Sequence, residues 1–277
     1  MIVSLSAATS GFVSASDSVA IASDAGFGHV GLRLDLAPPT AKELALTRRR
    51  LNDTGCRVFD IEVALMGRDH VSADRQQLVD LAAELGASHL LCVGEGDDRS
   101  VIADQLADLD ERCAEVGISA ALEWMPFRSV ATLDDAVEVI SLTGSSRIGV
   151  VVDALHLARS GGKPADLLAH HRRVAYLQLC DAPVVFDAGN FTDQGHATAH
   201  LAGTLTSPDR AAELAREART ARLLPGQGEL PLRELIDLFP GVPVSLEVPP
   251  TAGLDRAETI AHASAVRRAY ASLLDPR

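Results

Sequence analysis

The chain has 277 residues, of which 47% are apolar and 23% are charged, and its formal net charge is −13 at pH 7. This composition is typical of a globular protein with ample material for a hydrophobic core. The acidic balance argues against nucleic acids and anionic membranes as partners, because phosphate groups need a basic surface. No apolar stretch approaches the length that spans a bilayer.

The cysteines and the first residues indicate a cytoplasmic location. Cys56, Cys92, Cys113 and Cys180 lack CxxC and CxxH spacing, which predicts reduced and mostly buried thiols. Residues 1–6 have neither the basic region nor the long apolar region of a signal peptide, and they predict a first β-strand instead.

Apolar, β-branched segments alternate with helix-patterned segments along the chain. Because these segments are continuously apolar, they predict strands of a parallel sheet that is covered on both faces. The eight expected strands are residues 2–6, 29–34, 57–64, 89–93, 118–124, 148–153, 174–179 and 242–248. Helix signals lie between them, such as the capping box from Thr40 to Glu43 and the terminating glycines Gly55 and Gly117.

Eight strands that alternate with helices predict a (β/α)8 TIM barrel, formed as a single domain by residues 1–277. A doubly wound sheet is the competing fold, but residues 6–11 lack the glycine-rich phosphate loop that it usually carries after the first strand. Residues 182–225, before the last strand, include a long loop that we expect to be functional. In it, His196 and His200 would form a second metal pair only if helical, and Gly195 indicates a loop instead.

Four apolar segments in succession each carry one oxygen ligand at or near the end: Glu123, Asp153, Gln178 and Glu247. Such groups are costly to bury without compensation. The carboxyl ends of barrel strands share one mouth, so four adjacent strands could bring these side chains to one ion. Three carboxylates and an amide suit Mn²⁺ or Mg²⁺, with Co²⁺ or Zn²⁺ as alternatives. Taken singly, each residue could equally be a salt-bridge partner.

Further residues are candidates for substrate binding. His156 follows Asp153 by three positions, where the chain leaves the barrel, and could contact substrate. Arg222 precedes the turn at residues 225–228 and, like Arg33 at the end of the second strand, could meet an anionic substrate group. Trp124 could form a wall of the pocket, and Glu62 on the third strand could point to the mouth. Each of these residues also has an ordinary structural interpretation.

In combination, these motifs resemble those of the sugar phosphate isomerase/epimerase family, the xylose isomerase-like TIM barrels. The motifs are Leu122-Glu123-Trp124, Asp153-Ala154-Leu155-His156, Leu177-Gln178-Leu179-Cys180-Asp181, Pro225-Gly226-Gln227-Gly228 and Leu246-Glu247-Val248. The resemblance implies that Glu123, Asp153, Gln178 and Glu247 bind one divalent metal and that both glutamates also transfer protons. Glutamine as the third ligand is similar to hydroxypyruvate isomerases and 3-dehydroshikimate dehydratases, whereas ketose 3-epimerases typically have histidine there.

We therefore expect a metal-dependent isomerase or epimerase acting on a sugar or small polyhydroxy carbonyl compound. One glutamate would remove a carbon-bound proton, the metal would stabilise the enediolate, and the other glutamate would return the proton. Loss of a β-hydroxyl from the same enediolate would make the protein a lyase, of the 3-dehydroshikimate or inosose dehydratase type.

Two other classes are less favoured by the sequence. An endonuclease of the endonuclease IV type would need more histidine ligands, and a non-catalytic binding barrel would bind metal without exchanging substrate protons. A homo-oligomer remains open.

Overall fold

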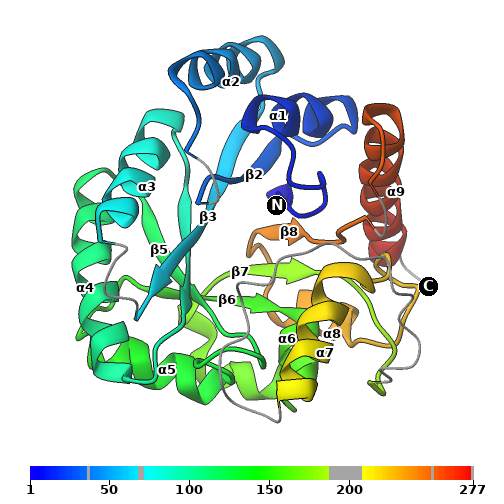
Figure 1. Cartoon of the computed structure of the whole chain (residues 1–277). Coiled ribbons are helices and arrows are strands. Elements are labelled where there is room, and N and C mark those ends of the chain that lie inside the picture. Colours follow the sequence, from blue (N-terminus) through cyan, green and yellow to red (C-terminus); the bar gives the residue numbers. More distant parts are fainter. Residues whose placement is uncertain (36–37, 68–71, 187–207, 251–252, 276–277) are drawn as a thin grey trace.

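Eight parallel strands close into a barrel in chain order, with β1 paired to both β2 and β8 (Figure 1). The computed structural model describes residues 1–35, 38–67, 72–186, 208–250 and 253–275. The strands are β1 (Val3–Leu5), β2 (His29–Arg33), β3 (Arg57–Met66), β4 (His89–Gly94), β5 (Ser119–Glu123), β6 (Gly149–Asp153), β7 (Val174–Leu179) and β8 (Val244–Leu246). The fold is a TIM barrel, as the sequence predicted.

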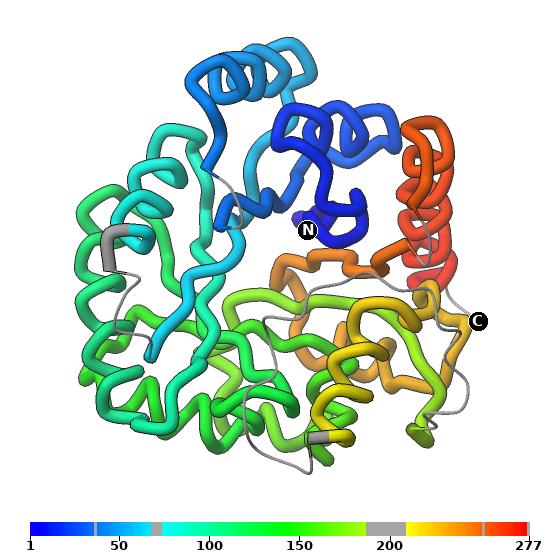
Figure 2. The backbone as a smooth tube through the Cα atoms, viewed as in Figure 1, coloured from blue at the N-terminus to red at the C-terminus, as the bar shows by residue number. Residues whose placement is uncertain are grey.

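Helices surround the barrel and connect its strands. They are α1 (Ala15–Asp24), α2 (Ala41–Thr54), α3 (Ser72–Leu85), α4 (Arg99–Glu115), α5 (Leu133–Leu142), α6 (Ala154–Arg159), the 3-10 helix η1 (Pro164–Arg173), α7 (Pro208–Thr220), α8 (Leu232–Leu238) and α9 (Arg256–Leu274). The helix signals of the sequence lie where they were expected. At the start of α2 Thr40 accepts a hydrogen bond from the N–H of Glu43 at 3.2 Å, and at its end Gly55 has a φ of 71°. The last helix, α9, packs beside α1 (Figure 2).

The ends of two strands determine where the candidate ligands lie. β6 ends with Asp153 itself, whereas β8 ends at Leu246, so Glu247 lies one residue beyond its strand. The N–H of Glu247 still donates to the carbonyl oxygen of Leu179 on β7 at 3.0 Å. This hydrogen bond holds Glu247 at the barrel mouth although it is outside the strand.

Other sequence expectations concern the cysteines, the loop histidines and membrane spans. All four cysteines are free and buried, as expected. His196 and His200 lie outside the described residues, so the structure does not test the second metal pair. Among the helices of the described ranges, none is both long enough and apolar enough to cross a bilayer.

Two hydrophobic clusters stabilise the barrel. The larger one fills the space between the strands and the surrounding helices, and it includes Trp124. The smaller one lies inside the barrel and contains Phe59, Leu91, Ala121 and Tyr176 among its buried side chains. Because successive side chains of a strand point to opposite faces, both sides of the strands are apolar and the strand segments read as continuously hydrophobic. The inner cluster forms an apolar floor below the mouth.

Candidate active site

Three of the four predicted ligands continue the inner face of the barrel. Side chains two positions apart on a strand share a face, and Glu123 and Gln178 follow the inner-cluster residues Ala121 and Tyr176 by two positions. Asp153 follows such a residue on β6 in the same way and is paired in register with Gln178. The strand ends therefore place these side chains directly above the apolar floor.

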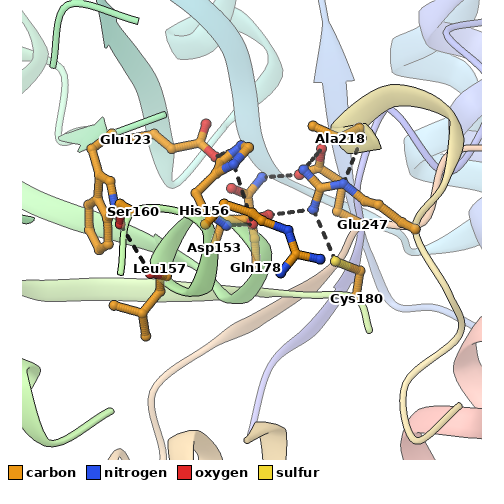
Figure 3. Close-up of polar contacts among 12 residues, drawn as sticks. Glu123, Asp153, His156, Leu157, Ser160, Gln178, Cys180, Ala218 and Glu247 are labelled. Carbon is orange, nitrogen blue, oxygen red and sulfur yellow. Dashed lines mark hydrogen bonds and ion pairs between the residues drawn. The ribbon is translucent and has the colours of Figure 1, made fainter. Parts of the chain in front are cut away.

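Gln178 and Glu247 are in direct contact. The Gln178 amide nitrogen donates to Glu247 Oε2 at 2.6 Å (Figure 3). The other end of the amide, Gln178 Oε1, is buried and has no hydrogen-bond partner among the described residues. An unpartnered buried acceptor is uncommon in native proteins and calls for a specific explanation, such as an ion. A cation in the mouth would provide one.

Arg222 lies inside the same cluster and is bound on several sides. Its Nη1 donates to Asp153 Oδ2 at 2.5 Å, and its Nη2 lies 3.3 Å from Glu247 Oε1. Its Nε donates to the carbonyl oxygen of Ala218 at 2.7 Å, and Nη1 also contacts Cys180 Sγ at 3.3 Å. The structure thus pairs Arg222 with two of the predicted ligands, and its predicted contact with an anionic substrate group remains untested.

His156 completes a compact group with Glu123 and Asp153. Its backbone N–H donates to Asp153 Oδ1 at 2.8 Å, because Asp153 is the N-cap of α6. Its Nε2 lies 3.7 Å from Glu123 Oε1, and one ligand atom from each of the three residues falls within 4.8 Å of the others. Burial lowers the pKa of His156 to about 4, which keeps the imidazole neutral and able to bind a metal or substrate.

The carboxylates of the mouth are only partly neutralised. Burial, together with the charges of Glu247 and Asp153, raises the pKa of Glu123 well above its ordinary value. Burial also raises the pKa of Glu247 despite the opposing effect of Arg222. For Asp153 burial acts in the same direction, but the charge of Arg222, together with His156 and the hydrogen bonds from both residues, outweighs it and lowers the pKa. Arg222 thus contacts only two of these buried acids, and the remaining excess of negative charge suits a divalent cation.

The other predicted substrate contacts lie in different environments. Glu62 is buried on β3, and burial together with the charges of Asp60 and Glu247 raises its pKa well above the ordinary value, so it faces the same lumen. Trp124 is fully buried in the outer cluster, and its indole N–H donates to Ser160 Oγ at 3.3 Å. Its placement gives no support to a role in the pocket wall, which remains a prediction.

The glycine turn before β8 is fastened to Asp181. Asp181 Oδ2 accepts the N–H of Gly226 at 2.9 Å, and Oδ1 accepts the N–H groups of Ala182 at 2.9 Å and Leu230 at 3.0 Å. A Cβ at Gly228 would lie 2.5 Å from Asp181 Oδ1. The close backbone approach at Gly228 is therefore toward a protein carboxylate that shapes the turn.

Sequence reasoning missed Asp60, a second acid inside the barrel. It is fully buried on β3, and Asp60 Oδ2 accepts a hydrogen bond from the Tyr176 hydroxyl at 2.9 Å. Its signal was present in the sequence, since Asp60 interrupts the apolar run of β3 in the same way as Glu62. Arg219 on α7 was also missed, because nothing in its local sequence distinguishes it from the other charged residues of that helix.

Known proteins with the same fold include several enzymes. The structure of the IOLI protein with a bound zinc atom shares 17% identity over 99% of this chain and 98% of its own, with a TM-score of 0.73. The probable 3-DHS dehydratase AsbF of Bacillus anthracis shares 18% identity over 96% of this chain and 99% of its own, with a TM-score of 0.68. An L-ribulose 3-epimerase shares 16% identity over 99% and 95% of the two chains, with a TM-score of 0.69.

The sequence comparisons give the family. The rhizopine catabolism protein MocC of Rhizobium meliloti is 31% identical over 115 residues, which are 41% of this chain and 35% of that protein. The match thus spans about a third of that curated relative. Residues 19–270 match the family described as xylose isomerase-like TIM barrel. Since the match covers most of the sequence, the chain belongs to the xylose isomerase-like TIM barrel family.

Proposed function

We propose that the protein is a divalent-metal-dependent isomerase or epimerase of a sugar or another small polyhydroxy carbonyl compound. The observation that carries this proposal is the convergence of Glu123, Asp153 and Glu247 with the unpartnered amide oxygen of Gln178 at one barrel mouth. Packing alone does not account for four such groups at one barrel mouth. Membership of a family whose structural relatives include an epimerase and a dehydratase supports it.

The residues that would hold the cation are Glu123, Asp153, Gln178 and Glu247, with His156 Nε2 close enough to Glu123 to contribute as well. When bound, the cation would supply Lewis-acid polarisation of a carbonyl oxygen. Mn²⁺ and Mg²⁺ suit the oxygen donors, and a nitrogen donor from His156 would favour Zn²⁺ or Co²⁺.

Glu123 and Glu247 are suited to move protons. Both are buried and have raised pKa values, so each would exchange a proton closer to neutral pH than an exposed glutamate. They come from β5 and from the end of β8, which separates them around the ring of strands. One glutamate would take the proton from the carbon beside the carbonyl, and the other would return it to the same or the adjacent carbon. The neutral imidazole of His156 would orient a substrate hydroxyl between them.

A lyase that dehydrates a hydroxy-ketone is the second candidate. Gln178 is compatible with it, because glutamine at this position is similar to 3-dehydroshikimate dehydratases as well as to hydroxypyruvate isomerases, and the fold likeness to the probable 3-DHS dehydratase is consistent with it. The same glutamates would remove the proton, and a β-hydroxyl would then leave. A conjugated product that absorbs in the ultraviolet would identify this reaction.

The test is hydrogen exchange in D₂O. The Mn²⁺-loaded protein is incubated with ketoses, inososes and dehydroshikimate, and deuterium at carbon is measured by NMR. We expect incorporation into one of these compounds, its absence after chelation, and a fall of about 10²–10⁴-fold in Glu247→Gln. Glu234→Gln on α8 makes the same chemical change away from the mouth and should leave exchange unaltered. Full exchange in the chelated protein or in Glu247→Gln would overturn the proposal.

A further inference from the structure

Three arginines lie at the junction of α6 and α7, and two of them have acidic partners. Arg159 donates to both carboxylate oxygens of Glu217, at 2.7 and 2.6 Å. Arg222 is bound by Asp153, as described above. Arg219, in the last turn of α7, forms no ion pair with any carboxylate of the described residues. It is therefore the cation of this group that lacks a counter-charge within the described protein.

Arg219 lies beside the mouth. Its guanidinium carbon is 5.9 Å from the centroid of the Phe127 ring. That ring packs edge to face against His156, with centroids 5.4 Å apart and an interplanar angle of 76°. His156 in turn lies 3.7 Å from Glu123. One aromatic ring thus separates the unpaired guanidinium from the histidine of the candidate metal cluster.

A second cation, Arg33, lies close enough to Arg219 for the two charges to interact. Arg33, at the end of β2, binds Asp35 and lies over the ring of Phe12, 5.6 Å from its centroid. Burial, together with the positive charge of Arg33, lowers the pKa of Arg219. Placing a partly buried charge without a partner near a like charge is unfavourable. An anionic ligand between the two elements would relieve both effects.

We infer that the substrate carries an anionic group, a carboxylate or a phosphate, which binds the guanidinium of Arg219. This inference rests on the proposed function, and it narrows the substrate from sugars in general to acidic or phosphorylated ones. A guanidinium presents paired N–H donors that match the oxygens of either anion. Phe127 covers one side of the guanidinium and keeps it near the mouth. Arg222 and Arg33, which the sequence offered as alternative contacts for an anionic group, are paired with carboxylates, and this makes Arg219 the better candidate.

Titration calorimetry with matched ligand pairs tests the inference on the Mn²⁺-loaded protein. D-Glucuronate is compared with D-glucose, and D-ribulose 5-phosphate with D-ribulose, so that the two arms separate a carboxylate from a phosphate. We expect one charged ligand to bind the wild type about tenfold to a hundredfold more tightly than its neutral partner. Arg219→Gln should abolish this preference and leave the neutral ligand unchanged, and Arg219→Lys should restore part of it.

Arg233→Gln is the control, because it removes an exposed arginine of α8 that pairs with Asp237. It should retain the full preference. Equal or undetectable binding of both members of each pair by the wild type would overturn the inference. Equal weakening of both members by Arg219→Gln would also overturn it.

Deuterium exchange separates this inference from the proposed function. Deuterium exchange into the neutral sugars, without tighter binding of their charged partners, would support the proposed function and contradict the anion site at Arg219. A preference for charged ligands that depends on Arg219, without deuterium exchange into any ligand, would support the anion site and contradict the proposed function.

Discussion

The barrel lumen holds buried carboxylates at two depths, and they are compensated differently. At the mouth, Arg222 contacts Asp153 at 2.5 Å and Glu247 at 3.3 Å, so a fixed cation offsets part of the charge. Deeper, Asp60 pairs in register with His89, the first residue of β4, and its side chain has the Tyr176 hydroxyl as a partner. Its other oxygen, Oδ1, has no hydrogen-bond partner among the described residues.

Asp60 and Asp153 differ in protonation for this reason. Burial raises the pKa of Asp60 to about 7, the hydrogen bond from Tyr176 opposes this rise only in part, and the charge of Glu247 adds to it. Asp153 is as deeply buried, yet Arg222 lowers its pKa. The guanidinium of Arg222 keeps Asp153 ionised and available to a metal, whereas Asp60 has no such partner and its pKa rises to about 7. Two equally buried aspartates of the lumen thus differ in charge, because only Asp153 has a guanidinium as its partner.

Removing the mouth charge should give the largest effect. Asp153→Asn takes away a predicted ligand and the main partner of Arg222. Loss of a group that only supports a metal ligand lowers the affinity of a metal site by about tenfold to a hundredfold. We expect the affinity for Mn²⁺ to fall at least as much. Mn²⁺ titration by calorimetry or electron paramagnetic resonance would measure it.

Asp110→Asn is the matched control for this change. Asp110 is also a buried aspartate bound to an arginine, since Arg147 contacts it at 2.7 Å, but it lies on α4 outside the barrel. An Asp153→Asn protein that binds Mn²⁺ as well as Asp110→Asn does would contradict the assignment of the mouth as the metal site.

Removing the deep charge should change how stability depends on pH. The pKa of Asp60 is about 7 in the folded protein, above the value of about 3.9 expected in the unfolded chain. Its stabilising effect is therefore fully present below about pH 4 and is lost as the pH rises through about 7. From pH 5 to pH 8 this group alone should reduce the free energy of unfolding by about 2 to 3 kcal/mol.

Asp60→Asn cannot titrate, so its stability should decline less over this range. Its melting temperature relative to the wild type should rise by about 3–5 °C between pH 5 and pH 8. Thermal unfolding followed by circular dichroism at several pH values would measure this, with Asp110→Asn as the control. Parallel curves for Asp60→Asn and the wild type would show that Asp60 is ionised throughout, as Asp153 is.

The residues of the mouth were easier to predict from the sequence than those of the floor, because the mouth residues lie near the ends of strands. Glu123, Asp153 and Gln178 end continuous apolar strands, and parallel strands bring such ends together by topology alone. Trp124 adjoins Glu123, and adjacent residues of a strand point to opposite faces, so its burial in the outer cluster follows from the alternation. Strand spacing therefore suffices to place residues that are carried by the barrel itself.

Contacts between distant segments were not predictable in this way. The hydrogen bond between Asp60 and Tyr176 joins residues 116 positions apart, and it requires both side chains to face inward at the same depth. The pairing of Arg222 with Asp153 depends on the chain after α7 returning across the mouth, which no residue pattern specifies. From the sequence Arg222 could either meet a substrate anion or form an ion pair, and only the tertiary structure supplies its partners.

Removing the Tyr176 hydroxyl should give the smallest effect and tests whether the two depths are separate. Tyr176→Phe leaves Asp60 without its observed donor, so we expect a loss of about 0.5–1.5 kcal/mol in the free energy of unfolding at pH 6, and more at pH 8, where the acceptor is charged. Urea unfolding at both pH values measures this. Tyr270→Phe, whose hydroxyl contacts only Met1 Sδ at 3.9 Å among the described residues, is the control.

The same Tyr176→Phe protein should bind Mn²⁺ like the wild type. Tyr176 lies two residues before Gln178 on β7 but donates downward, to Asp60. Its loss should therefore raise the pKa of Asp60 further without altering the mouth. A stability loss no larger than that of Tyr270→Phe would show that the hydrogen bond from Tyr176 to Asp60 does not stabilise the fold. A fall in metal affinity would instead show that the two depths are electrostatically coupled, through the charges of Asp60 and Glu247.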